Sequence, residues 1–592
     1  MSQQNLIDGD KLLKQGQFQA ALTEYEKELT LMSSSLPGWR GKALCHANLG
    51  QWMEALEGCL NVLGYGNNQV QDADMFIRIL DSSRLTSHIS LIEDALIIAL
   101  QSTLLEGKAI DLLTRQFITK HNQVLESQPT KYDSSVERFI TDDTLCKLIE
   151  RSCIVHYPLE KLLLLGRREV LQRGAAGQNI QIFRPFLSAL ACQSLLNDGL
   201  YFTTNAEQAI LDTLVSSNST DNIDVNTLLL QLCYAPFEQT MTLWQQHKPA
   251  LEAAKLSQLT TDLAFYDEVV SATHLGEVFD ETSKTVQSFY TQNPYPKWKS
   301  LVFTPVPLER FFEMNGLKAN AKIKVLIAGC GTGKQAVEMA LANQLAQITA
   351  IDLSPTSLAY ARLMAKHYEV SNIDFQLLDI LDVATLNHQF DYIMSTGVIH
   401  HMNSPQDGLN ALSGVLNPNG LMLLGFYSAA ARVDLPTYQQ EVKATLLADE
   451  TLTPKTLSRW RSQLNDDDFK RKWFNSHDFF SLNGMMDALF HPQQSEYTLM
   501  EIQELLDNTG LQFGQMAVSN QCKAIYKQAL EDFPVMGNHE ELSKWHIFEL
   551  SNPHFFDAMY NFFVTSGTGK PKQAAPQPDL SDILNRLKNK IS

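Results

Sequence analysis

The sequence predicts an α/β protein in which a mostly parallel sheet is preceded by a long all-helical region. Apolar strand segments alternate with helical segments between about residues 320 and 430, and the first strand runs into a glycine-rich turn, KVLIAGCGTG. Continuous apolar strands separated by helices indicate a parallel sheet that is buried on both faces. Before about residue 280, apolar residues recur every three or four positions, which indicates helices.

Length and composition indicate a globular chain of several domains. The 592 residues exceed the roughly 250–300 that a single core usually holds. Hydrophobic residues make up 44% of the chain and charged residues 19%, which is typical of a soluble protein. No stretch reaches the roughly 18 apolar residues of a membrane span, and the first residues lack the apolar core of a secretion signal. We therefore expect a cytoplasmic protein with no membrane partner.

Charge and cysteine content argue against two further kinds of partner. The net charge of −19 repels polyanions, so no nucleic-acid partner is expected. The eight cysteines are scattered without a C-x-x-C pair, so neither a disulfide framework nor a metal site is expected. Cys330 lies inside the glycine turn, where a small side chain filling a tight turn is favoured over a reactive thiol.

The N-terminal part of the chain contains an internal repeat. GQFQAALTEYEKEL and GQWMEALEGCLNVL align so that five residue pairs lie 34 positions apart: Gly16 and Gly50, Phe18 and Trp52, Ala21 and Ala55, Leu22 and Leu56, and Tyr25 and Cys59. This period is typical of tetratricopeptide repeats, in which small residues let paired helices approach closely. We assign residues 1–70 to such repeats and residues 71–280 to an all-helical platform that continues the stack.

The glycine turn after the first strand predicts a ligand site. Gly329 lets the chain leave the strand in a conformation that a Cβ would obstruct, and Gly331 lets the backbone touch a ligand. Gly333 lets the following helix pack close to the sheet. Free amides and the positive end of the helix dipole favour an anionic group at this helix N-terminus. An acidic residue, Asp352, closes the next strand and would accept hydrogen bonds from two ribose hydroxyls.

The spacing of the turn decides among three ligand classes. A P-loop needs Gly-x-x-x-x-Gly-Lys-Ser/Thr, but Ala328 occupies the first glycine position and Gln335 the last. A dinucleotide fold prefers Gly-x-Gly-x-x-Gly, whereas this chain reads Gly-x-Gly-x-Gly. That pattern favours S-adenosylmethionine.

The later strands support this choice. IDFQLLD ends in Asp379, a carboxylate that could accept a hydrogen bond from an adenine amino group, and Ile380 could cover the ring. FDYIMST is a fourth strand that leads into GVIHHM, and LMLLGFY is a fifth. Together these residues resemble the class I S-adenosylmethionine-dependent methyltransferases. The resemblance implies a Rossmann-like domain whose cofactor residues are Gly329, Gly331, Gly333, Asp352, Leu353, Asp379 and Ile380. A Rossmann-like sheet that has lost its ligand is the alternative.

A narrower resemblance covers most of the chain. FYTQNPYPKW, FLSALACQSLL, FFSLNGMMDALFH, EYTLMEIQELLDNTGLQF and FELSNPHFFDAMYNFFV are similar to segments of bacterial proteins that join tetratricopeptide repeats to a class I methyltransferase. The chain departs from the QYEENPYPRW-type signature at Phe289, Thr291 and Gln292, while Tyr290 and the NPYP core are retained. We place the methyltransferase core at residues 281–435.

The remainder of the chain divides into three parts. Residues 436–495 are expected to form a helical insertion that acts as a lid over the carboxyl edge of the sheet. Residues 496–566 would complete the catalytic domain. Residues 567–592 contain a Pro- and Gln-rich linker and a helix whose apolar stripe would dock on a partner or on its own domain. This stripe consists of Leu580, Ile583, Leu584, Leu587 and Ile591.

Catalytic residues are less evident than the cofactor site. Methyl transfer from a sulfonium needs no covalent residue, and a base helps only if the acceptor arrives protonated. His400 and His401 follow the fourth strand and are candidates for a base, although packing is the alternative role. Tyr295 is a further catalytic candidate. Tyr290 and Tyr427 are candidates for the acceptor site, because aromatic faces suit a cation.

Two functional hypotheses from different classes follow. The first is a methyltransferase that acts on a protein or peptide acceptor recruited by the helical repeats, or on a small molecule. The second is an interaction protein whose methyltransferase domain binds the cofactor but is inactive. A hydride-transferring dehydrogenase is a third hypothesis. The repeats could equally mediate a homodimer.

Overall fold

We describe the protein from a computed structural model. It covers residues 2–65, 70–82, 89–216, 224–271, 280–302, 306–320, 322–445, 452–464, 476–519, 522, 526, 541–552, 555–556 and 558–566. The chain forms two compact units, which we call the helical unit and the sheet unit. The helical unit contains Met1–Asp267, Lys297–Pro305 and Arg461–Leu482. The sheet unit contains Glu268–Pro296, Val306–Trp460 and Asn483–Ser592.

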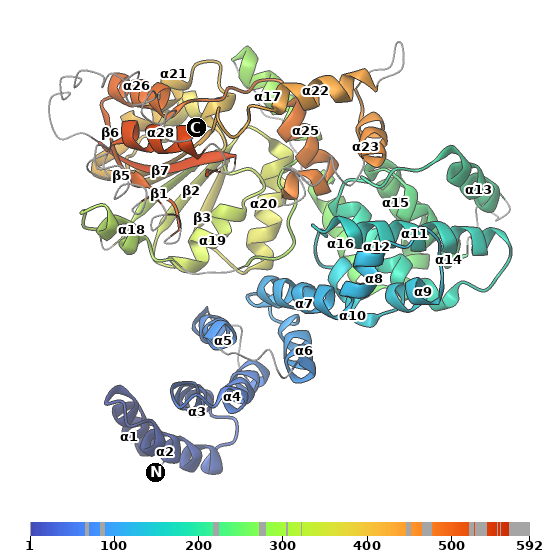
Figure 1. Cartoon of the computed structure of the whole chain (residues 1–592). Helices are drawn as coiled ribbons and strands as arrows, with labels where there is room; N and C mark the ends of the chain where they lie inside the picture. The colour runs from blue at the N-terminus through green and yellow to red at the C-terminus, as the bar shows by residue number, and fades with distance from the viewer. Residues whose placement is uncertain are drawn as a thin grey trace, which may run out of the picture. The chain divides into compact units, whose positions relative to one another are not determined.

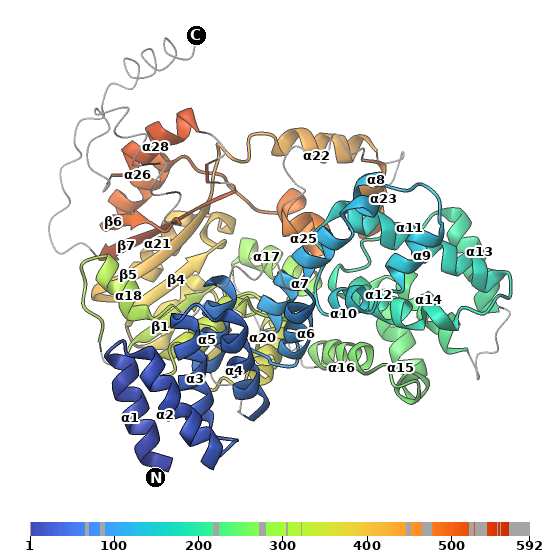
Figure 2. The same ribbon diagram turned by 60° about the horizontal axis from the view of Figure 1, so that its bottom comes forward.

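The helical unit consists of helices that follow one another along the chain (Figures 1 and 2). These are α1 (Ser2–Lys14), α2 (Phe18–Leu31), α3 (Leu36–Asn48), α4 (Trp52–Tyr65), α5 (Val70–Ser82), α6 (Ile89–Ala99), α7 (Glu106–Lys120), α8 (Asn122–Ser127), α9 (Ser134–Ile140), α10 (Asp143–Ile149), α11 (Tyr157–Ala175), α12 (Arg184–Leu196), α13 (Asn205–Ser216), α14 (Val225–Tyr234), α15 (Phe237–Ala253) and α16 (Ser257–Ser271). The described part of the chain before residue 280 is therefore helical, as predicted.

The first four helices repeat the 34-residue offset found in the sequence. α1 and α3 begin 34 residues apart, as do α2 and α4. Gly16 and Gly50 follow the first helix of each pair with φ angles of 73° and 74°, a left-handed conformation that favours glycine. Tyr25 is fully buried, and a Cβ at Gly41 would lie 2.2 Å from its Cζ atom. The close packing of α2 on α3 therefore requires glycine at this position.

Two later segments of the chain are built into the helical unit through ion pairs. Lys297 pairs with Asp198, and Nζ of Lys299 lies 2.5 Å from Oδ2 of Asp262. Arg461 forms a bidentate pair with Glu160 at 2.5 and 2.8 Å, and both side chains are at least nine-tenths buried. A lone buried charge is costly, so each partner holds the other segment in place.

The sheet unit contains a seven-stranded sheet in the order β3-β2-β1-β4-β5-β7-β6. The strands are β1 (Lys324–Ala328), β2 (Gln347–Asp352), β3 (Ile373–Leu377), β4 (Phe390–Thr396), β5 (Leu416–Tyr427), β6 (Leu511–Met516) and β7 (Met559–Ser566). β1 to β5 pair in parallel, and β7 pairs antiparallel with both β5 and β6. The predicted α/β fold with a mostly parallel sheet is confirmed.

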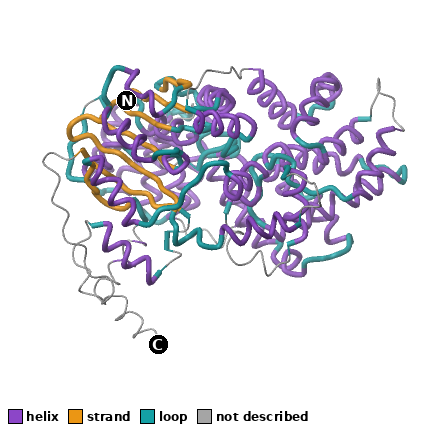
Figure 3. The backbone as a smooth tube through the Cα atoms, turned by 90° about the horizontal axis from the view of Figure 1, so that it is seen from above, coloured by secondary structure: helices purple, strands orange, loops and turns teal. Residues whose placement is uncertain are grey.

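Helices cover both faces of this sheet, as Figures 1 and 3 show. The helices of the sheet unit are α17 (Glu281–Gln292), α18 (Leu308–Met314), α19 (Lys334–Ala342), α20 (Pro355–His367), α21 (Pro405–Gly414), α22 (Leu435–Ala444), α23 (Pro454–Gln463), α25 (Leu482–Phe490), α26 (Leu499–Thr509) and α28 (Leu542–Ser551), with 3-10 helices η3 (Ile380–Leu386) and η4 (Ile399–His401). The last residues of α23, from Arg461 onward, and the first residue of α25, Leu482, belong to the helical unit.

Side chains point alternately to the two faces of the sheet along each strand, so each face has its own apolar core. Val325 and Ile327 of β1 pack with α18 and α19 on one face. Leu326 and Ala328 pack with α21, α26 and α28 on the other. Successive side chains of a strand point to opposite faces, so a strand covered on both sides must be apolar throughout. This explains the unbroken apolar run VLIA, Val325 to Ala328, in β1.

The structure addresses one of the remaining predictions and does not test two others. No helix among the described residues is long and apolar enough to cross a membrane. The predicted amphipathic stretch in residues 567–592 lies outside the described residues. The domain boundaries proposed from the sequence, including the lid role of residues 436–495, stay predictions.

Candidate functional site

A cavity of about 470 Å³ lies at the carboxyl ends of the parallel strands. Gly329 follows β1, Asp352 closes β2, Thr396 closes β4 and Tyr427 closes β5, and all four line the cavity. Asp379, which follows β3, lines it as well. Open parallel sheets bind ligands at this edge, where the loops from successive strands meet. The cavity therefore occupies the position that the sequence predicted for the ligand.

The glycine turn has the conformation that its three glycines permit. Gly329, Gly331 and Gly333 have φ angles of 76°, 52° and 82°. A Cβ at Gly329 would lie 2.4 Å from Cγ2 of Val398, and one at Gly333 would lie 2.5 Å from Cβ of Ala361. Gly329 and Gly331 line the cavity, whereas Gly333 supports the start of α19 from behind. Any side chain at these positions would fill the cradle or strain its backbone.

Asp352 is held by backbone amides. Its Oδ2 accepts a hydrogen bond from the Gly331 amide at 2.7 Å, and its Oδ1 accepts one from the Ser354 amide at 2.8 Å. Burial raises the pKa of Asp352, while these amides act in the opposite direction. The carboxylate is thereby fixed between β2 and the glycine turn, with further lone pairs available to a ligand.

The second acidic residue is also placed by the backbone. Asp379 precedes η3, and its Oδ1 accepts a hydrogen bond from the Leu381 amide at 3.0 Å. Leu353 and Ile380 line the cavity beside the two acids. Six of the seven predicted cofactor residues thus line one cavity. Their individual contacts with a cofactor stay predictions.

The segment that precedes the sheet forms another wall of this cavity. The side chain of Gln287 on α17 donates a hydrogen bond to the Leu353 carbonyl at 2.9 Å. Ser354 donates through Oγ to the Tyr290 carbonyl at 3.1 Å, and Thr332 donates to the Pro296 carbonyl. Tyr290, Tyr295 and Pro296 line the cavity. The NPYP segment therefore covers the glycine turn through backbone contacts.

Tyr290 contacts Asp487, a residue that was not among the candidates from the sequence. Tyr290 donates its hydroxyl hydrogen to Oδ1 of Asp487 at 2.6 Å, and burial raises the pKa of Tyr290 well above its usual value. Tyr427 and Asp487 both line the cavity. Asp487 and His491 lie one helical turn apart within the FFSLNGMMDALFH stretch. That Asp-x-x-x-His spacing was the available signal.

The two adjacent histidines have different positions. His400 is fully buried, stacks on Tyr427 with ring centroids 3.8 Å apart, and does not line the cavity. Its Nδ1 accepts a hydrogen bond from the Tyr427 amide at 3.3 Å, and burial lowers its pKa well below the ordinary value. His401 lines the cavity. The structure therefore places His400 in the core and leaves His401 as the histidine that can reach a ligand.

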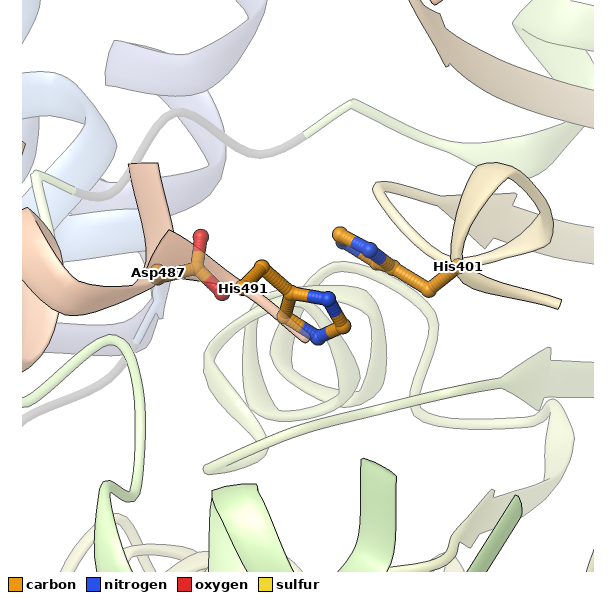
Figure 4. Close-up of side chains that lie close together, drawn as sticks. All are labelled: His401, Asp487 and His491. Carbon is orange, nitrogen blue, oxygen red and sulfur yellow. The ribbon is translucent and has the colours of Figure 1, made fainter. Parts of the chain in front are cut away.

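His401, Asp487 and His491 form a buried cluster (Figure 4). One nitrogen of each histidine and one carboxylate oxygen of Asp487 lie within 4.8 Å of one another. The histidine rings have centroids 3.7 Å apart and a tilt of 33°. Burial lowers the pKa of His401 to about 4 and that of His491 to about 3, so both rings are neutral near pH 7.

The hydrogen bonds of the cluster limit which of its atoms could bind a metal ion. The Gln493 amide donates to Nδ1 of His491 at 3.1 Å, so Nε2 carries the hydrogen in the neutral ring. In this state His491 has no free lone pair for a metal ion, and only His401 and Asp487 remain as ligand-type groups of the cluster.

The charges that line the cavity suit a cation. Among its described lining residues are five aspartates, Asp280, Asp352, Asp379, Asp407 and Asp487, and one lysine, Lys334. Cys330 also lines the cavity, but burial raises the pKa of its thiol well above the ordinary value, which keeps it protonated. The residues present therefore fit a ligand with ribose hydroxyls and a positive charge, such as S-adenosylmethionine.

Comparisons with known proteins agree with this geometry. The sequence profile described as "Methyltransferase domain" matches residues 319–483. An uncharacterized protein of Synechococcus sp. is 27% identical over 284 residues, which cover 44% of this chain and 62% of that protein. The malonyl-[acyl-carrier protein] O-methyltransferase of Acetivibrio thermocellus is 28% identical over 142 residues, which cover 24% of this chain and 49% of that protein. The chain therefore spans less than two thirds of these relatives.

Comparison with solved structures also finds partial similarities. PKMT2 from Rickettsia typhi in complex with AdoHcy is 16% identical, with a TM-score of 0.31 over 48% of this chain and 56% of that one. The predictions of a methyltransferase and of its cofactor are confirmed at the level of the domain. The sheet unit of this chain carries a methyltransferase domain, and the cofactor of that domain is S-adenosylmethionine.

Proposed function

We propose that the protein is an S-adenosylmethionine-dependent methyltransferase that acts on a protein or peptide acceptor. The observation that carries this proposal is the extent of the cavity at the carboxyl ends of the parallel strands. It contains the glycine turn and Asp352 on one side and continues to Tyr290, Tyr427 and His401 on the other. One cavity thus offers room for a donor and an acceptor together.

Different residues of the cavity hold the cofactor and the acceptor. The cofactor supplies a methyl group that is already activated on a sulfonium. Gly331 leaves the backbone open to the amino-acid part of the cofactor, Asp352 accepts from the ribose, and Asp379 with Ile380 receives the adenine. Tyr290, Tyr295 and Tyr427 enclose the acceptor and exclude water. Such positioning provides much of the rate in a displacement reaction.

The protein acceptor is inferred from the helical unit. The repeated helix pairs α1–α2 and α3–α4 support the assignment of residues 1–70 to tetratricopeptide repeats, which commonly bind extended peptides. We infer that these repeats recruit the acceptor in the cytoplasm. A small-molecule acceptor, and a homodimer formed through the repeats, are the alternatives that the experiment below distinguishes.

Labelled cofactor identifies the acceptor. The purified protein is incubated with S-adenosylmethionine that carries a radioactive methyl group and with a bacterial cell extract, and the products are separated by size. A labelled protein band supports the proposal, and label in the small-molecule fraction identifies a small acceptor. If neither fraction is labelled while calorimetry detects cofactor binding, the protein is an inactive scaffold. Deletion of residues 2–65 should abolish labelling of a protein band without changing cofactor affinity.

A further inference from the structure

The backbone of Gln493 holds His401 and His491 in opposite tautomers. The Gln493 carbonyl lies 2.8 Å from Nδ1 of His401, so that nitrogen must carry the hydrogen. The Gln493 amide donates at 3.1 Å to Nδ1 of His491, so that nitrogen must carry the lone pair. Because both rings are neutral, the lone pair of His401 lies on Nε2 and the hydrogen of His491 lies on Nε2. Gln493 therefore makes one histidine a proton acceptor and the other a donor.

We propose that Nε2 of His401 is the base that takes the proton from the methyl acceptor, and that His491 and Asp487 are its positioning residues. This inference rests on the proposed function. Of the two histidines, His401 alone lines the cavity, and it does so near Tyr290 and Tyr427. The ring of His491 packs on that of His401 and fixes its orientation.

The proposed step transfers one proton from the methyl acceptor to His401. The bond between the acceptor atom and its hydrogen breaks, and its electron pair stays on the acceptor atom, which becomes the nucleophile. The proton binds to Nε2 of His401. The Asp487 carboxylate, whose oxygen lies within 4.8 Å of the histidine nitrogens, stabilises the resulting imidazolium. The proton returns to solvent when the product leaves. The acceptor therefore belongs to the class whose nucleophilic atom carries an exchangeable proton, an ammonium or a hydroxyl.

The other groups that face the cluster are consistent with this assignment. Arg432 lies near enough to His401 and His491 to disfavour the protonated form of each ring in the free protein, and Asp487 acts in the opposite direction on His491. Nε2 of His491 is buried and has no hydrogen-bond partner among the described residues. An unpaired buried donor is unfavourable and persists where a site requires it. His491 lies beside His401 and Asp487 (Figure 4), and both of these residues line the cavity.

Nitrogen NMR of the free protein tests the tautomers without any turnover. The full chain is labelled with ¹⁵N at histidine, and the two resonance pairs are assigned from the variants His401→Gln and His491→Gln. We expect the hydrogen on Nδ1 in His401 and on Nε2 in His491 near pH 7. A hydrogen on Nε2 of His401 would overturn the proposal, since the nitrogen assigned as the base would then have no lone pair.

Single-turnover kinetics with labelled cofactor and the unmethylated form of the acceptor identified in the extract test the base itself. Relative to the wild type, His401→Gln should lower the rate by about 10²–10³-fold without changing cofactor affinity. Added imidazole should partly restore the rate of His401→Ala, which a merely structural role would not allow. His388→Gln, at an exposed histidine of the same unit, serves as the matched control.

Three outcomes would count against the proposal. A wild-type rate in His401→Gln, or no imidazole rescue in a folded His401→Ala, would refute the base assignment. Loss of activity in a chelator and recovery with Zn²⁺ would show that the cluster holds a metal ion instead. If the wild type labels no acceptor, the proposed function fails and the base assignment fails with it, even where the NMR shows the expected tautomers.

Discussion

Tyr290 and Asp487 are joined by a hydrogen bond of 2.6 Å, although 197 residues separate them along the chain. Tyr290 lies on α17, which precedes the sheet, and Asp487 lies on α25, which follows β5. The carbonyl of Tyr290 also accepts a hydrogen bond from Ser354, two residues after Asp352. Tyr290 therefore links the expected ribose site to the proposed acceptor site.

Removal of the Tyr290 hydroxyl should destabilise the sheet unit. In Tyr290→Phe, Asp487 loses one charge-assisted hydrogen bond in a buried position, which costs about 1.5–3 kcal/mol. Urea denaturation followed by tryptophan fluorescence measures the change. Tyr65→Phe, at an exposed tyrosine of the helical unit, should leave stability within about 0.5 kcal/mol of the wild type. Equal stability of Tyr290→Phe and the wild type would contradict the hydrogen bond.

A matched pair of glycines separates steric clash from backbone strain. Gly333 and Gly316 both have positive φ angles, but only at Gly333 would a Cβ meet a neighbour, Ala361 at 2.5 Å. Gly316→Ala should therefore cost about 1–2 kcal/mol for its left-handed backbone alone. Gly333→Ala should cost a further 1–3 kcal/mol or so from overpacking. Equal losses in thermal unfolding of the two variants would show that α19 does not pack tightly on α20.

Asp352 should determine cofactor affinity. Asp352→Ala removes the acceptor expected for the ribose hydroxyls and the partner of the Gly331 and Ser354 amides. We expect calorimetric binding of S-adenosylmethionine to fall by at least about 100-fold, since charge-assisted hydrogen bonds are worth about 1.5–3 kcal/mol each. Asp374→Ala, at an exposed carboxylate on β3, should bind normally. Normal binding by the Asp352 variant would refute the ribose contact.

The histidine cluster should make the free energy of unfolding depend on pH. The pKa values of His401 and His491 are about 4 and about 3 in the folded chain, against an ordinary value of 6.5. As pH falls below about 6.5 the unfolded state binds protons first, so stability is full above that value and is lost toward pH 4. Each unit of pKa difference corresponds to about 1.4 kcal/mol.

The doubly substituted chain His401→Gln, His491→Gln tests this dependence. Its melting temperature should fall less steeply between pH 6.5 and 4.5 than that of the wild type, because two titrating groups have been removed. His388→Gln should follow the wild-type curve. Parallel curves for the double variant and the wild type would mean that the two rings are not held neutral by burial.

The helical unit offers a test of its buried ion pair. Glu160→Gln leaves the Arg461 charge inside the unit without its carboxylate, which should cost about 3–5 kcal/mol. Replacing both residues by methionine should cost less than the single change, because no lone charge remains. Chemical denaturation of the three chains distinguishes these cases. A smaller loss in the single variant than in the double variant would contradict the pairing.

Local features of the site could be predicted from the sequence, whereas its tertiary features could not. The glycine turn and Asp352 belong to one strand-turn-helix-strand unit, so their spacing alone places them at the cavity. Asp487 and His491 lie more than 130 residues after Asp352, and only the folded chain brings them to Tyr290 and His401. Within η4, the backbone alone decides that His400 enters the core and that His401 lines the cavity.

The segment that matches the methyltransferase profile, residues 319–483, contains the cofactor cradle but not all of the cavity. Tyr290 and Tyr295 precede it, and Asp487, Met559 and Asn561 follow it, yet all five line the same space. Genetic exchange of the profiled segment alone would carry Tyr427 and His401 to a new protein together with the glycine turn, but would leave Tyr290, Tyr295 and Asp487 behind. Recombination that keeps the described lining of this cavity whole must therefore join the chain before Asp280 and after Asn561.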